Sequence, residues 1–255
     1  MNIKKGDIVT RRSYNHDTAF KVINVKDGIY FLKGIEARLL ANSNEDDLVI
    51  VEDYIEDFID VDNNRNIKED DFFYLPAKIL HIDGDNEYLE KCLKYYKKNG
   101  VYAIGKKIKE DSIHLQLNAL LTDFKPDILI ITGHDAFYSK KGPIDDIRSY
   151  KNTADFIKAI KVARNYERSH EKLVVIAGAC QSYYEELIKS GANFASSPKR
   201  VNIHALDPAI IATTIALTEK NKEIDLLDLL DKTKYGKDGV GGLYTRGFMY
   251  VGYPR

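Results

Sequence analysis

The chain has 255 residues, and its 38 lysines and arginines nearly balance its 39 aspartates and glutamates, for a net charge of −1. This length is enough for one large domain or two unequal ones around a sizeable buried core. The balanced charge argues against a protein that binds nucleic acid through bulk electrostatic attraction. The two cysteines, Cys92 and Cys180, form no CxxC pair, which argues against a disulfide framework or a zinc site, so we expect no metal and no cofactor.

The apolar segments and cysteine usage predict a cytoplasmic protein. The first residues, MNIKKGDIV, lack the apolar core of a signal peptide. No apolar run approaches the roughly 18 residues that a membrane-spanning helix requires. Free cysteines are typical of a reducing compartment. We therefore expect neither a membrane nor a nucleic-acid partner.

Residues 1–51 carry the pattern of a small all-β domain. Five short β-rich segments follow one another, with Gly, Asn or Asp near most of the breaks, at residues 6–13, 19–25, 28–34, 37–42 and 47–51. Strands this short and closely spaced are typical of a small curled sheet or an SH3-like barrel. Residues 52–75 are rich in aspartate and glutamate, and we predict that they form a solvated linker.

Residues 76–255 alternate strand and helix patterns. The predicted strands cover residues 77–85, 101–108, 128–133, 173–178 and 201–206. The predicted helices cover residues 86–100, with Asn86 as N-cap, 111–124, 153–169, 182–191 and a segment that opens at Asp207 and Pro208. Repeated βα units with right-handed crossovers predict an α/β fold with a parallel, doubly wound sheet. For this sheet we assume the flavodoxin-like strand order 2-1-3-4-5. For GKDGVGG at residues 236–242 we predict a flexible loop.

Cys180 stands out because it follows a short apolar strand pattern, LVVIAGA, and directly precedes a predicted helix. In a parallel α/β sheet, ligands bind outside the carboxyl ends of the strands. A thiol at the start of a helix lies near the positive end of the helix dipole, which favours the nucleophilic thiolate. The alternative is a buried cysteine that acts only as a small apolar residue. For Cys92, in the middle of a predicted helix, that alternative is the interpretation we favour.

His134 ends the preceding strand pattern, ILIITGH, in the same way. An imidazole titrates near neutral pH, so it can act as a general base or as a proton donor to a leaving amine. If the two strands are neighbours, His134 and Cys180 meet in one crevice as a base and a nucleophile. A histidine at a strand end can also be a simple polar cap, but two reactive residues at equivalent strand ends favour a site. His204, in the predicted strand VNIHAL, is the rival base.

Several segments resemble a known group of peptidases. The apolar blocks before His134 and before Ala-Cys180 resemble the caspase–gingipain–legumain clan of cysteine peptidases, whose His and Cys follow successive strands of an α/β sheet. Longer strings resemble the YabG-type sporulation peptidases over nearly the full chain: GDIVTRRSYN, LPAKILHIDGD, PDILIITGHD, VVIAGACQSYYEELIKSGANFASSPKRVNIHALDP and GGLYTRG. The run GACQS…GANFASSP…NIHALDP is very specific.

The resemblance implies a cysteine endopeptidase that processes spore coat and other spore proteins in spore-forming Firmicutes. It would act in the cytoplasm of the mother cell or at the forming spore coat, with Cys180 as nucleophile and His134 as its partner. In the clan a glycine usually follows the histidine, and its amide helps to form the oxyanion hole, whereas here Asp135 follows. Asp135 and Gly133 are therefore the candidates for the oxyanion hole or, through the Asp135 carboxylate, for support of the imidazole.

Two aspartates at the end of the first predicted strand, Asp83 and Asp85, are candidates for substrate binding, as is His204. In the order 2-1-3-4-5 the first strand lies next to the third, so both carboxylates would border the crevice. An acidic pocket selects Arg or Lys before the scissile bond. The alternative is that HIDGD is only an acidic turn that caps the next helix.

Two other functions remain open. GACQS nearly matches the G-x-C-x-G elbow of glutamine amidotransferases, in which the histidine follows the cysteine; that enzyme would use Cys180 and His204 to hydrolyse glutamine. The chain could also be a non-catalytic spore-assembly protein whose small β domain binds other proteins. Cys180→Ala would abolish cleavage by a peptidase and leave a scaffold unaffected. The sequence leaves the oligomeric state open.

Overall fold

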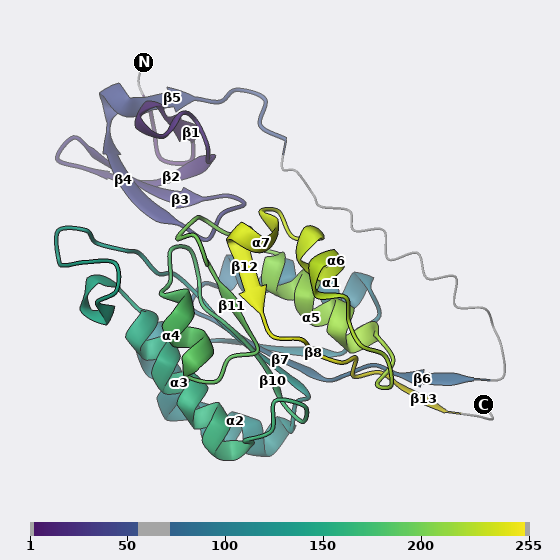
Figure 1. The fold of residues 1–255 in the computed structure, drawn as a ribbon. Coiled ribbons are helices and arrows are strands. Elements are labelled where there is room, and N and C mark those ends of the chain that lie inside the picture. Colours follow the sequence, from purple (N-terminus) through teal and green to yellow (C-terminus); the bar gives the residue numbers. More distant parts are fainter. Residues whose placement is uncertain (1–2, 56–71, 253–255) are drawn as a thin grey trace. The chain divides into compact units, whose positions relative to one another are not determined.

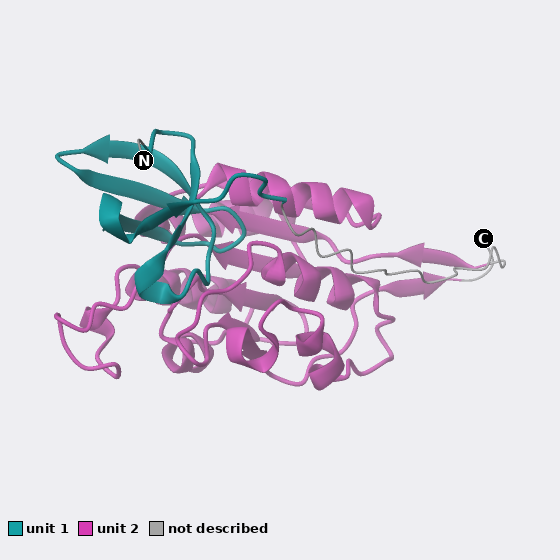
Figure 2. Cartoon of the chain, turned by 90° about the horizontal axis from the view of Figure 1, so that it is seen from above, with its two compact units in different colours: residues 1–60 teal, residues 61–255 magenta. Residues whose placement is uncertain are grey.

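The computed structural model describes residues 3–55 and 72–252. The chain divides into two compact units, Met1–Asp60 and Val61–Arg255, which are coloured separately in Figure 2. Most of the predicted acidic linker, residues 52–75, lies outside the described residues. Within the described part of that stretch, Phe73–Leu75 forms a short strand, β6.

The first unit is a single antiparallel sheet in the order β4-β3-β2-β1-β5. Its elements are β1 (Ile8–Arg11), β2 (Phe20–Lys26), β3 (Ile29–Gly34), β4 (Leu40–Asn44) and β5 (Leu48–Ile50), with short 3-10 turns η1 (Arg12–Tyr14) and η2 (Glu45–Asp47). Alternate residues such as Val22 and Leu32 pair across the strands and point into the core. The predicted small β sheet is confirmed, although β4 begins at Leu40 rather than at residue 37.

The second unit contains a six-stranded sheet in the order β12-β11-β10-β9-β7-β8 (Figure 1). Its strands are β7 (Ile79–Asp83), β8 (Ala103–Lys107), β9 (Ile128–Thr132), β10 (Val174–Ala177), β11 (Phe194–Ser196) and β12 (Val240–Gly242). The first five are parallel to one another, and β12 runs antiparallel to β11. In chain order the parallel strands therefore follow the predicted sequence 2-1-3-4-5. Apolar runs such as Ile128–Thr132 are buried along their whole length, as expected for strands covered on both faces.

Helices cover both faces of this sheet (Figure 1). On one face lie α1 (Asn86–Lys98) and α5 (Asp207–Leu217), which contact each other and strands β7, β8 and β9. On the other lie α2 (Ile113–Phe124), α3 (Thr153–Tyr166) and α4 (Tyr184–Lys189), whose apolar residues share one buried cluster with Leu80, Leu129 and Val175. The doubly wound arrangement predicted from the alternating patterns is thus present. The helices α6 (Leu226–Asp231) and α7 (Gly236–Gly239) and the 3-10 turns η3 (Glu110–Ser112) and η4 (Ile147–Ser149) complete the unit.

Two predicted elements are wrong. The fifth strand is Phe194–Ser196, and residues 201–206 form no strand because side chains bind their amides: Cys180 Sγ accepts from Ile203, and Asp207 accepts from His204. The predicted flexible loop at residues 236–242 is instead the helix α7 followed by the edge strand β12.

A small ribbon lies outside the main sheet. Strand β13 (Tyr250–Gly252) pairs antiparallel with β6, so the first and last described strands of the second unit lie side by side. Figure 1 shows this ribbon extending away from the six-stranded sheet. Within the described ranges, no helix combines the length and the apolar character needed to cross a membrane.

Candidate active site

His134 and Cys180 lie at the same edge of the six-stranded sheet. Strands β9 and β10 are adjacent and parallel, with Ile131 paired to Ala177 at their carboxyl ends. His134 follows the end of β9 by two residues, and Cys180 follows the end of β10 by three. Strand order reverses between β7 and β9, so this edge also contains the switch point where such sheets bind ligands.

Cys180 is fully buried in this structure. Its Sγ accepts a hydrogen bond from the Ile203 N–H at 3.3 Å and lies 3.8 Å from the Ile203 carbonyl oxygen. Gly178 and Gln181 both have positive φ, which turns the chain sharply after β10. Helix α4 begins only at Tyr184, so the thiol does not directly precede a helix as predicted. The thiol instead contacts the backbone N–H and carbonyl oxygen of Ile203.

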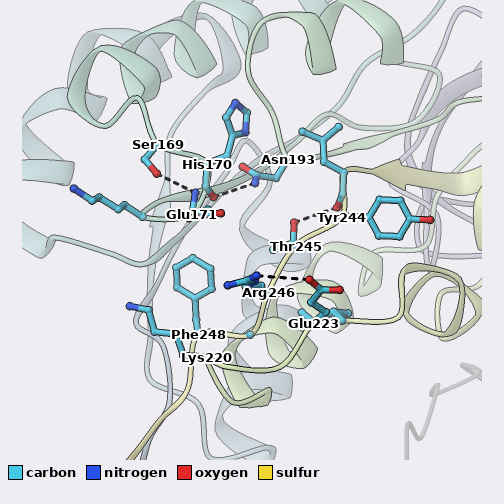
Figure 3. Close-up of a pocket in the computed structure, with 14 residues that line it drawn as sticks. Ser169, His170, Glu171, Asn193, Lys220, Glu223, Tyr244, Thr245, Arg246 and Phe248 are labelled. Atoms are coloured by element: carbon cyan, nitrogen blue, oxygen red, sulfur yellow. Dashed lines mark hydrogen bonds and ion pairs between the residues drawn. The ribbon is translucent and has the colours of Figure 1, made fainter.

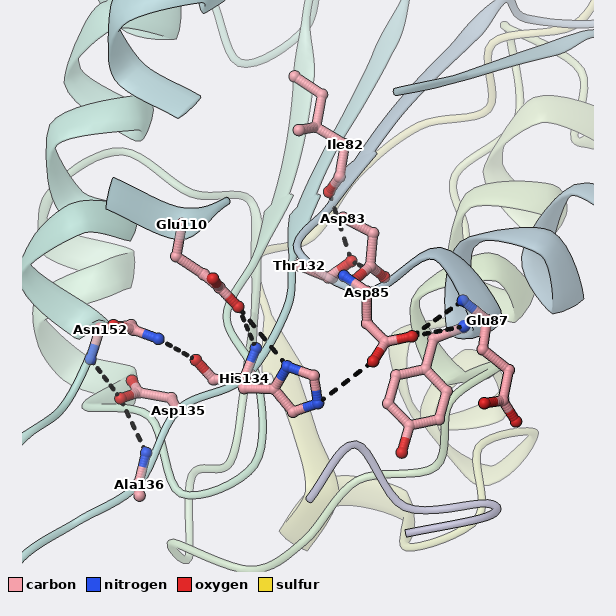
Figure 4. Close-up of polar contacts among 12 residues, drawn as sticks. Ile82, Asp83, Asp85, Glu87, Glu110, Thr132, His134, Asp135, Ala136 and Asn152 are labelled. Atoms are coloured by element: carbon pink, nitrogen blue, oxygen red, sulfur yellow. Dashed lines mark hydrogen bonds and ion pairs between the residues drawn. The ribbon is translucent and has the colours of Figure 1, made fainter. Parts of the chain in front are cut away.

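His134 lies between two carboxylates (Figure 4). Its Nδ1 is 3.7 Å from Glu110 Oε1, and its Nε2 is 3.7 Å from Asp85 Oδ2. The Tyr88 ring packs against the imidazole with a centroid separation of 5.8 Å. The Asn152 amide donates to the His134 carbonyl oxygen at 2.7 Å and so holds the backbone of this loop. Among the described residues, the buried Nε2 has no hydrogen-bond partner.

Glu110, in the 3-10 turn η3, is the residue at this site that sequence reasoning missed. Its Oε1 accepts the His134 backbone N–H at 2.7 Å. The carboxylate lies against Gly84 and Gly133, where an added Cβ would overlap Oε1. Burial alone would raise the pKa of Glu110, but the His134 N–H and the nearby imidazole outweigh it and lower the pKa below its ordinary value. The only available signal in the sequence was its position just after the second predicted strand.

The Asp135 carboxylate joins the loop after β9 to the loop after β10. It accepts hydrogen bonds from the amides of Ala136 and Asn152 and from the hydroxyls of Thr153 and Ser182. The Ser182 hydroxyl in turn accepts from Ala179 N–H, beside Cys180. Burial raises the pKa of Asp135, and these donors offset part of that effect. The Asp135 carboxylate therefore does not contact the imidazole. Support of the imidazole was one of the two roles considered for Asp135.

The amides of Gly133 and Asp135 remain as candidate oxyanion donors. Neither N–H donates a hydrogen bond to any residue within 3–55 or 72–252, whereas the His134 N–H between them is bound to Glu110. Backbone N–H groups at a strand end can supply donors to a developing oxyanion.

The two aspartates of the acidic turn HIDGD have mainly structural roles. Asp83 is fully buried; it accepts from Thr132 Oγ1 and Asp85 N–H and lies 3.7 Å from His81 Nε2. Asp85 is the N-cap of α1, because its side chain accepts from the amides of Glu87 and Tyr88. The cap was predicted one residue later, at Asn86. Of the two aspartates, only Asp85 has a side chain that is partly exposed, at 14%.

His204 is buried in the segment that covers Cys180. Its Nδ1 accepts from Leu206 N–H at 3.2 Å, and its own N–H donates to Asp207 Oδ2 at 2.9 Å. His204 directly follows Ile203, whose N–H donates to the Cys180 sulfur, so its backbone lies near the thiol.

A groove of about 750 Å³ lies at the opposite edge of the sheet (Figure 3). It is lined by residues 169–172, which precede β10, by Asn193, which precedes β11, and by residues 243–248. Because the strands are parallel, this edge is remote from the carboxyl ends that position His134 and Cys180. No group of three or more potential ligands among the described residues could hold a metal ion.

Comparisons with known proteins identify relatives of the whole chain. A family profile described as YabG peptidase U57 matches residues 4–62 and 56–254. The chain is also similar to the sporulation-specific protease YabG of Bacillus subtilis (strain 168). The two are 37% identical over 288 aligned residues, which include 100% of this chain and 99% of that protein.

Proposed function

The chain belongs to the YabG peptidase family, and on that premise we propose that it is a cysteine endopeptidase with Cys180 as nucleophile and His134 as general acid and base. Membership makes it a peptidase with a role in sporulation. The observation that carries the cysteine mechanism is the position of both residues at the carboxyl ends of adjacent parallel strands, β9 and β10. The Asp135–Ser182 hydrogen bond, which ties the two loops together, supports the same pairing.

The proposed reaction proceeds in two steps. His134 accepts the proton of the Cys180 thiol, and the resulting thiolate attacks the scissile carbonyl carbon. As the C–N bond breaks, the His134 imidazolium gives this proton to the leaving amine. In the second step water gives a proton to His134, attacks the thioester and releases the new carboxyl group together with the thiolate. The amides of Gly133 and Asp135 would stabilise the oxyanion in both steps.

Substrate access requires a local change near Cys180. The thiol is fully buried, and the Ile203 N–H is bound to its sulfur. A peptide carbonyl therefore reaches Sγ only when the backbone around Ile203 moves away. The weak contacts of Sγ with the Ile203 N–H and carbonyl oxygen are lost in this step, and because water can replace them, each costs less than an ordinary hydrogen bond of about 1 kcal/mol.

Covalent labelling tests the identity of the nucleophile. A panel of peptidyl acyloxymethyl ketones, which alkylate activated thiols, should add one label per chain. Peptide mapping by mass spectrometry should locate it at Cys180 and not at Cys92, although both thiols are buried. A label on Cys92, or substrate cleavage that continues after Cys180 is fully labelled, would contradict the proposal.

We further propose that cleavage follows Arg or Lys. Asp85, whose carboxylate is partly exposed beside His134, is the residue expected to bind the basic side chain, because Asp83 is fully buried. A charged contact of this kind contributes about 1.5–3 kcal/mol, or roughly a ten- to hundredfold preference over glutamine. Asp85→Asn should reduce the Arg-to-Gln ratio of kcat/KM by about that factor, measured on matched peptides.

Asparagine is a suitable replacement because it caps helices as well as aspartate does. The ratio of two substrates also cancels any effect of the change on His134. An Arg-to-Gln ratio that stays the same in Asp85→Asn would leave HIDGD with only its capping role.

The finer features of the proposal come from the family resemblance. The five parallel strands in the order 2-1-3-4-5 support a caspase-like sheet, and the five-stranded antiparallel unit supports an SH3-like module. We propose that residues 1–51 bind other proteins, that residues 52–75 link them to a catalytic domain of residues 76–255, and that the substrates are spore coat and other spore proteins in the mother cell.

A further inference from the structure

We propose that Glu110 is the positioning residue of His134: it holds the imidazole with its proton on Nδ1 and leaves Nε2 to exchange protons during catalysis. This inference rests on the proposed role of His134. It adds a carboxylate from a separate element, the 3-10 turn after β8, to the two residues on β9 and β10.

A single oxygen of Glu110 faces two groups of His134. Oε1 accepts the backbone N–H at 2.7 Å and lies 3.7 Å from Nδ1 of the same residue. The first contact determines where the loop after β9 lies, and the second places the carboxylate that binds this loop against Nδ1. A separation of 3.7 Å exceeds a hydrogen bond, but such catalytic contacts are often long before substrate binds.

The surroundings keep the carboxylate in this place. Glu110 Oε1 occupies the space that a Cβ atom at Gly84 or at Gly133 would need. The Glu110 side chain is only 15% exposed. Any larger residue at either glycine would displace it. The carboxylate is therefore shielded from water. In such an environment of low dielectric constant, a charge acts more strongly on its neighbour than it does in solvent.

The other side of the ring is consistent with this assignment. Nε2 is buried without a hydrogen-bond partner among the described residues, as expected for the nitrogen that meets the reacting groups. The other titratable groups facing the ring are Asp85, whose Oδ2 lies 3.7 Å from Nε2 while its Oδ1 caps α1, and the hydroxyphenyl ring of Tyr88. The Asp135 carboxylate is bound to Thr153 and Ser182.

Glu110→Gln tests the inference, because the glutamine oxygen can still accept the His134 N–H while the charge is removed. We expect kcat to fall about 100-fold with KM within about twofold, since the tautomer matters to proton transfer and not to binding. Glu110→Asp, which retains the charge, should recover most of the wild-type kcat.

Asp111→Asn is the matched control, since it removes a neighbouring exposed carboxylate of the same turn and should change neither kcat nor KM. A wild-type kcat in Glu110→Gln would overturn the inference.

A second measurement does not depend on cleavage. In the Cys180→Ala background, the ¹⁵N chemical shifts of the neutral His134 ring should show the proton on Nδ1, and Glu110→Gln should weaken that preference. A proton on Nε2, or a tautomer ratio that Glu110→Gln leaves unchanged, would refute the positioning role even if Cys180 is the nucleophile. Conversely, full cleavage by Cys180→Ala would refute the proposed nucleophile and leave the tautomer result valid.

Discussion

Cys180→Ala is expected to reduce peptide cleavage by at least about 10⁴-fold, because a methyl group can neither attack a carbonyl nor form an acyl-enzyme. The measurement is mass spectrometry of a candidate coat protein incubated with the wild type and with the variant. New peptides should accumulate with the wild type alone.

Two controls separate chemistry from folding. Alanine also removes the sulfur that accepts the Ile203 N–H, which can lower the free energy of unfolding by about 1–3 kcal/mol. Cys180→Ser restores an acceptor, so it should be equally inactive and closer to the wild type in Tm. Cys92→Ala, which alters a buried thiol on α1 that contacts the Ala205 carbonyl oxygen, should retain activity. A folded Cys180→Ala protein that still cleaves would exclude a cysteine mechanism at this position.

His134→Ala is expected to lower kcat by about 10²–10⁴-fold, the usual contribution of a general acid–base residue. The matched change is His204→Asn. His204 Nδ1 accepts the Leu206 N–H, and the asparagine side-chain oxygen can take over that contact, so His204→Asn should remain folded and active within about tenfold. The measurement is kcat and KM for both variants on one peptide.

The opposite pattern would change the assignment of function. His204 directly follows the residue whose N–H is bound to the Cys180 sulfur, which is the observation that keeps it as a rival. A soluble His134→Ala protein with full activity, together with an inactive His204→Asn protein, would transfer the catalytic role to His204. It would also favour the amidotransferase-like arrangement, which glutamine hydrolysis would then test.

The apolar patterns were sufficient to predict most of the second unit. Runs such as ILIIT are too short for helices and too continuous for a half-exposed sheet, so they predict buried parallel strands. The two elements that failed, residues 201–206 and 236–242, are short, and local patterns do not distinguish their alternatives. VNIHAL has a strand composition, but Cys180 and Asp207 bind its amides, and this is visible only when distant segments meet.

The sequence by itself determined that a thiol and an imidazole occur at equivalent strand ends, because strand ends can be located from periodicity. The strand order 2-1-3-4-5 is one of several that right-handed crossovers allow, so the structure was needed to establish that the two strands are neighbours. Only the tertiary structure decided what surrounds the thiol and the imidazole. Glu110 reaches His134 across the sheet edge, Asp135 turns from the ring to Ser182, and Ile203 covers Cys180. These contacts depend on side-chain directions in loops, where many conformations satisfy the same sequence and the packed sheet selects one.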